Sequence, residues 1–111
     1  MKFTHSILRD LSRLESLGIT WEDAIELSRI AKCMDRIHTD GCEMDSADPV
    51  YLRRELRILK RLKRLFGAYP ELGWYEQHDP RGMLLYVGKK EFTTDPRIKQ
   101  VYDSVLVRVP F

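Results

Sequence analysis

Residues 48–67, DPVYLRRELRILKRLKRLFG, constrain the fold most, because they carry two side-chain patterns at helical spacing. Asp48 is a good N-cap, Pro49 suits the first helical position, and Gly67 can adopt the left-handed conformation just past a helix end. Apolar residues recur every three or four positions and therefore share one side: Leu52, Leu56, Leu59, Leu62, Leu65 and Phe66. The pattern predicts one long helix with an apolar side.

A second side of the same helix is basic. Its cations recur at similar spacing and form a row along the helix: Arg53, Arg57, Lys60, Arg61 and Arg64. The arginine side chain presents a planar fork that suits bidentate contacts with phosphates or carboxylates. Nucleic acid is therefore the leading candidate partner. An acidic protein surface, such as that of a host nucleic-acid-processing complex, is the alternative.

The charge distribution leaves a third interpretation open. Residues 1–48 carry a net charge of −4, residues 49–66 carry +6, and residues 67–111 are neutral. The preceding helix presents Glu22, Asp23 and Glu26, so part of the basic side can pair inside the molecule or stay solvated. We expect the row Arg53, Arg57, Arg61 and Arg64 to remain free. The leucines of the same helix offer a surface for a homodimer.

The chain of 111 residues predicts a single soluble domain, with 43% hydrophobic and 32% charged residues. Cys33 and Cys42 are too few for a disulfide scaffold, and residues 1–10 lack the apolar run of a signal peptide. No apolar segment approaches the roughly 20 residues of a membrane-spanning helix. We therefore expect a cytoplasmic protein that does not associate with membranes.

The chain divides into a helical part, residues 1–67, and a part with strand periodicity, residues 68–111. Helices are predicted over residues 4–17, 20–38 and 49–66, with a loop at 39–48. Strands are predicted over residues 73–78, 83–87 and 104–111, with a turn at 79–82, a polar connection at 89–94 and a short helix at 95–102.

These elements predict one α+β domain. An N-terminal helical hairpin and the long basic helix pack on a small antiparallel sheet of about three strands. We expect Trp74, Tyr86 and the C-terminal valines to make the contact between the sheet and the helices. Antiparallel packing of the second and third helices is the economical arrangement.

The sequence also contains a few candidate metal ligands, but no catalytic motif. Cys33, His38 and Cys42, with His78 as a fourth ligand, have spacings loosely compatible with zinc, but no CxxC pair is present. No nucleophile elbow, metalloprotease helix, P-loop or dinucleotide-binding pattern occurs. We therefore expect a protein that is not an enzyme and holds neither a metal nor a cofactor.

The turn between the first two strands is a second candidate site. His78 and Arg81 lie on its rigid support, flanked by Tyr75 and Tyr86, and such a group of cations and aromatic rings suits a phosphate, a base or a partner loop. The same residues are also explained as a well-formed type I turn, and we favour this structural interpretation.

Residues 75–87, YEQHDPRGMLLYV, combine a Tyr, a Gln, an Asp-Pro-Arg-Gly turn and an apolar strand that ends in Leu-Tyr before its last valine. This pattern resembles a motif of small, uncharacterised accessory proteins of bacteriophages and prophages. Residues 102–105, Tyr-Asp-Ser-Val, are similar to the Tyr-Ser, valine-rich terminus of those proteins.

The resemblance covers residues 30–111, and the hairpin is its specific part. His78 stands where the family often has Gly, and residues 39–48 replace a longer loop that contains cysteine. The resemblance implies an accessory gene of a mobile element. Products of such genes bind DNA or block a host defence complex, as anti-CRISPR proteins do. It implies no catalytic residue.

Overall fold

The computed structural model describes residues 4–41, 48–79, 82–94 and 105–111. It confirms the α+β fold. Within these ranges the helices are α1 (His5–Glu15), α2 (Trp21–Gly41), α3 (Pro49–Phe66) and α4 (Lys90–Thr94). The strands are β1 (Leu72–Asp79), β2 (Gly82–Lys89) and β3 (Val107–Arg108), which form one antiparallel sheet in the order β1-β2-β3.

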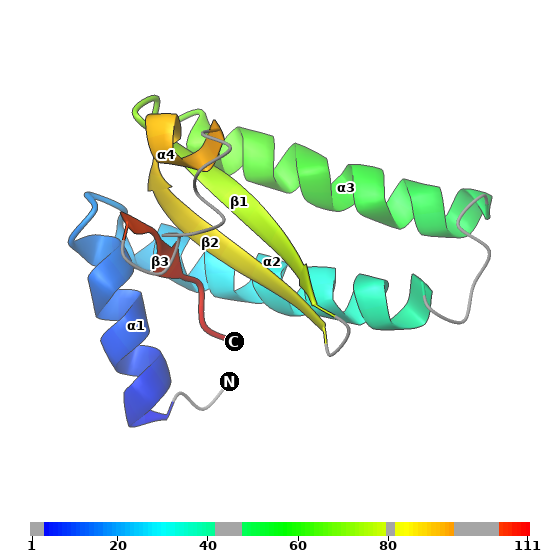
Figure 1. The fold of residues 1–111 in the computed structure, drawn as a ribbon, viewed down its shortest axis with the longest axis horizontal. Helices are drawn as coiled ribbons and strands as arrows, with labels where there is room; N and C mark the ends of the chain where they lie inside the picture. Colours follow the sequence, from blue (N-terminus) through cyan, green and yellow to red (C-terminus); the bar gives the residue numbers. More distant parts are fainter. Residues whose placement is uncertain (1–3, 42–47, 80–81, 95–104) are drawn as a thin grey trace.

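Helix α2 is the centre of the molecule. It packs against α1, α3 and strand β2, and the sheet crosses over it (Figure 1). α2 and α3 lie side by side and antiparallel, as expected from the short connection between them. The core is organised around α2 because this helix buries a row of apolar side chains, namely Ala24, Leu27, Ile30 and Ala31.

The two sheet faces have different neighbours. Val87 of β2 is paired with Val107 of β3, and both belong to the core that contains α2 and α3. Trp74 reaches the same core and lies against Phe66, with ring centroids 5.2 Å apart. Side chains alternate along a strand. Tyr86 therefore lies on the opposite face in a small cluster with Leu106, and its expected contact with the helices was wrong.

Side chains cap the starts of three helices, and the cap expected at Asp48 is confirmed. Thr4 accepts from the Ile7 amide, Thr20 from the Asp23 amide at 3.2 Å, and Asp48 from the Val50 amide at 2.8 Å. The left-handed conformation expected of Gly67 was wrong, since its φ and ψ of −58° and −28° are right-handed. The chain continues there through two tight turns instead, and Gly18 is the glycine with φ of +93°.

The second half of the chain differs from expectation in two places. Residues 90–94, predicted as a polar connection, form α4, which packs over the open end of the hairpin. The terminal strand covers only Val107 and Arg108, although the Val109 amide still donates to the Leu85 carbonyl at 2.8 Å. The helix expected over residues 95–102 lies outside the described residues.

A carboxylate of α2 holds the turn end of the hairpin. The amide of Met83 donates to Asp35 Oδ1 at 3.0 Å, across 48 residues of sequence. A Cβ on Gly82, where φ is +156°, would meet the same carboxylate oxygen. The glycine of the Asp-Pro-Arg-Gly motif is thus required by the approach of α2, which gives the motif a structural role.

Candidate functional site

The outer side of α3 carries a row of exposed cations. Arg53, Arg57, Lys60 and Arg64 are all exposed, and Lys63 lies beside them. Arg53 donates from Nε to the Pro49 carbonyl at 3.2 Å, a bond within its own helix. Among the described residues, Arg57, Lys60, Lys63 and Arg64 take part in no ion pair. We call Arg53, Arg57, Lys60 and Arg64 the basic face.

Arg61 does not belong to the basic face. It turns towards α2, where its Nε and Nη2 donate to Glu26 Oε1 at 3.2 and 2.5 Å. This hydrogen-bonded pair raises the pKa of Arg61 above its usual range, so the guanidinium keeps its charge at any pH at which the protein is folded. The expectation that Arg61 stays free was therefore wrong. Arg61 is thus a cation of α3 that pairs inside the molecule, which agrees with the third interpretation of the charge distribution.

Part of the apolar pattern of α3 is also exposed. The buried residues are Ile58, Leu62, Leu65 and Phe66, all in the second half of the helix. Leu52 and Leu56 remain 44% and 56% exposed. The first turns of α3 extend beyond the described strands of the hairpin (Figure 1).

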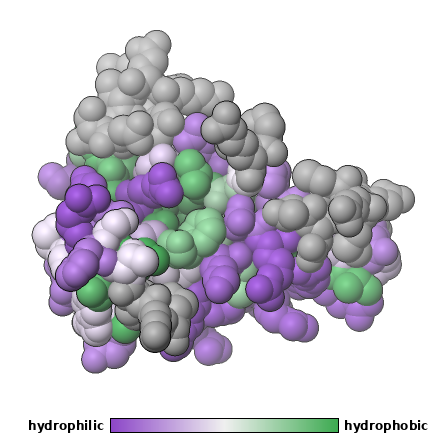
Figure 2. All heavy atoms as spheres, turned by 90° about the horizontal axis from the view of Figure 1, so that it is seen from below, coloured by the Kyte–Doolittle hydropathy of each residue, from purple (hydrophilic) through white to green (hydrophobic). Residues whose placement is uncertain are grey.

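Figure 2 shows the molecule from below as a largely hydrophilic face with apolar residues near its centre. A smaller apolar group lies at the right-hand end of this face, where α2 ends and α3 begins in Figure 1. Val50, which is 54% exposed, belongs to the same first turns of α3 as Leu52. Apolar and basic surface are therefore adjacent on this helix.

The candidate metal ligands separate into two places. Cys33 is a free thiol within 4.0 Å of Arg61 Nη1, in the contact between α2 and α3, and Cys42 lies outside the described residues. His38 and His78 do come together, with ring centroids 5.6 Å apart. No group of three or more His, Cys, Asp or Glu side chains within the described ranges is arranged to hold a metal ion.

His78 lies on the far side of α3 from the basic face. It is the last residue but one of β1, is exposed, and its Nε2 lies 3.8 Å from a carboxylate oxygen of Glu76. Arg81, the other residue expected at the turn, lies outside the described residues. The structure thus does not place His78 with the cations of α3.

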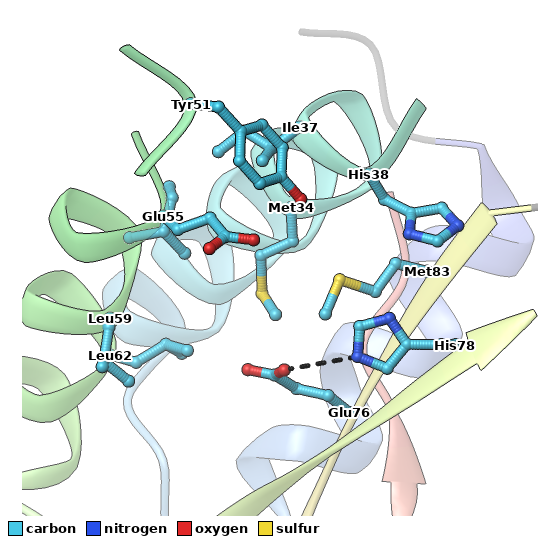
Figure 3. Close-up of a pocket in the computed structure, with 11 residues that line it drawn as sticks. Met34, Ile37, His38, Tyr51, Glu55, Leu59, Leu62, Glu76, His78 and Met83 are labelled. Carbon is cyan, nitrogen blue, oxygen red and sulfur yellow. Dashed lines mark ion pairs between the residues drawn. The ribbon is translucent and has the colours of Figure 1, made fainter. Parts of the chain in front are cut away.

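A cleft that the sequence did not predict opens between α2, α3 and the hairpin. It has a volume of about 370 Å³. Met34, Ile58, Leu62 and Met83 supply its apolar wall, and Tyr51, Glu55, Glu76 and the two histidines its polar groups (Figure 3). Its residues come from four elements, α2, α3, β1 and β2, and are up to 49 positions apart, so no local motif signals it.

Neither family models nor curated proteins nor solved structures show a match to this chain. No helix in the described part of the chain is long and apolar enough to cross a membrane. The fold creates two surfaces that could carry a function, the basic face and the cleft.

Proposed function

We propose that this protein is a non-enzymatic accessory protein of a phage or prophage that binds nucleic acid through the basic face of α3. The observation that carries the proposal is the exposure of Arg53, Arg57, Lys60 and Arg64 without an acidic partner among the described residues. The phage origin is supported by the resemblance of the hairpin sequence and of residues 102–105 to those accessory proteins.

The dimensions of the basic face suit a phosphate backbone. The eleven residue steps from Arg53 to Arg64 rise by about 16 Å, at about 1.5 Å per residue. That length corresponds to about five base-pair steps of about 3.4 Å along one strand. Four contacts predict a salt slope of about −3.6 on duplex DNA, or about a 150-fold loss of affinity between about 50 and 200 mM salt.

The test measures fluorescence anisotropy of a labelled duplex of about 20 base pairs, and of its single strand, between about 50 and 200 mM salt. In the triple variant Arg57→Gln, Lys60→Gln, Arg64→Gln, one phosphate contact remains, so the slope should fall to about −0.9. Gln keeps a high helix propensity, so the fold should be retained.

Two controls separate the basic face from net charge. Arg61→Gln removes a cation that points at Glu26, and it should leave the slope unchanged. Arg9→Gln with Arg13→Gln removes two exposed charges from α1, away from α3, and should also leave it unchanged. The absence of binding at about 50 mM salt, or an unchanged slope in the triple variant, would refute the proposal.

A second candidate function is supported by the exposed apolar residues. The exposed side chains of Leu52 and Leu56 can make no polar contact with a phosphate backbone. A protein partner with an apolar and acidic surface would cover both the leucines and the basic face. This arrangement suits an anti-defence protein, such as an anti-CRISPR, or a regulator that blocks a host nucleic-acid-processing complex.

The two functions respond differently to one variant. Leu52→Ser with Leu56→Ser changes no charge, so binding to nucleic acid should be unaffected. Docking on a protein should weaken, because serine in place of each leucine removes the apolar surface that the partner would bury. The comparison uses capture from a host lysate with the wild-type protein, the leucine variant and the triple variant side by side. Light scattering of the same samples reports a homodimer.

A further inference from the structure

The cleft between α2, α3 and the hairpin is a second site, independent of the basic face. Its lining residues on α3 include positions 51, 55, 58 and 62, and the basic face has positions 53, 57, 60 and 64. An offset of two residues is about 200° around an α-helix, so the two sets point in opposite directions. A nucleic acid on the basic face would not reach the cleft.

The cleft combines apolar walls with negative charge. Figure 3 shows the carboxylates of Glu55 and Glu76 entering from opposite walls, with the ends of Met34 and Met83 between them. No Lys or Arg is found among the described residues that line it. Glu55 takes part in no ion pair within those residues, and Glu76 faces only His78 at 3.8 Å. The absence of a lysine or arginine is notable beside a helix with seven of them.

We propose that this cleft binds a small organic cation, a primary ammonium group carried on an apolar body. A carboxylate at the wall of the cleft would accept from the ammonium in a charge-assisted hydrogen bond, and Glu55 and Glu76 together make the cleft negative. Tyr51 lies on the α3 wall together with Glu55, and its aromatic ring would attract a cation. Anionic ligands are disfavoured because two carboxylates would oppose them.

The apolar part of the cleft sets the size of the ligand. A volume of about 370 Å³ lies at the lower end of the range of about 300–1,000 Å³ for small-molecule pockets. Met34 and Met83 belong to its apolar lining, and methionine adapts its flexible side chain to ligands of varied shape. The site therefore fits an amine with one ring or a short alkyl chain, and not a nucleotide or a longer polymer.

The experiment uses three probes of matched shape. These are 2-phenylethylamine, the neutral 2-phenylethanol and the anionic phenylacetate, each titrated up to about 10 mM at about pH 8, where an alkylammonium remains protonated. The readout is NMR of methyl-labelled methionine. The amine should shift the Met34 and Met83 signals and bind at least about tenfold more tightly than the alcohol. Phenylacetate should give no shift.

Variants then test the carboxylates. Glu55→Gln with Glu76→Gln keeps the size of both side chains, and it should reduce the affinity for the amine to that for the alcohol. Glu22→Gln removes an exposed carboxylate on α2 outside the cleft and should change nothing. Equal binding of all three probes would show an apolar cavity without charge selectivity. That result, or no shift with the amine, would overturn the proposal.

Discussion

The contact between Asp35 and the hairpin gives a prediction that can be worked through quantitatively. Gly82→Ala would place a Cβ against Asp35 Oδ1 and keep a φ of +156°, which side chains rarely adopt. Each effect costs about 1 kcal/mol or more, so the free energy of unfolding should fall by about 2–3 kcal/mol. Asp35→Ala removes the acceptor of the Met83 amide, a bond to a charged group worth about 1.5–3 kcal/mol.

The two changes should not add. Once Asp35 is alanine, the carboxylate that collides with a Cβ at position 82 is gone, and only the backbone cost remains. The double variant should therefore be about 1 kcal/mol more stable than the sum of the single variants predicts. Interactions of Asp35 with other groups cancel in this cycle, because they are lost in both backgrounds.

The measurement is urea unfolding of the wild type, both single variants and the double variant, followed by the fluorescence of Trp21 and Trp74. Equal slopes against urea would show that the unfolded states are comparable. If the two free-energy changes add within about 0.3 kcal/mol, Asp35 is not what requires a glycine at this turn, and the explanation of the motif is refuted.

Two further stability predictions follow from single contacts. Arg61→Met should lower the free energy of unfolding by only about 0.5–1 kcal/mol, because both side chains of the pair with Glu26 are about one-third exposed. The pair with Glu26 raises the pKa of Arg61, so this loss should stay constant as pH rises towards about 12. A measured loss above about 3 kcal/mol would mean that the pair is effectively buried. Tyr69→Phe removes a hydroxyl that accepts from the Thr20 amide at 3.0 Å and donates to Asp23, so thermal unfolding should occur about 4 °C lower. An unchanged midpoint would show that water replaces the hydroxyl at the start of α2.

Local patterns predicted most of the secondary structure. The helices at residues 4–17, 20–38 and 49–66 agree with α1, α2 and α3 to within a few residues, because caps and helical spacing are properties of neighbouring positions. The hairpin was found for the same reason, from its turn residues and period of two. The short helix α4 was missed, since five residues of KEFTT carry no periodic signal.

The candidate site was predicted less completely. Helical spacing shows which residues share a side of α3, but it does not show which side meets α2. Ile58 faces the core and Leu56 does not, although both are apolar and two positions apart. In the same way Arg61 pairs with Glu26 while Arg57 and Arg64 remain exposed.

The sequence alone determined the long helix of residues 49–66, its excess of cations and the hairpin, because these depend on spacing along the chain. Only the tertiary structure decided which cations form the basic face, why Gly82 is required beside Asp35, and that Glu55 and Glu76 share a cleft. Each of these depends on contacts between residues 20 or more positions apart. Such contacts are set by how whole elements pack, and periodicity within one element carries no information about them.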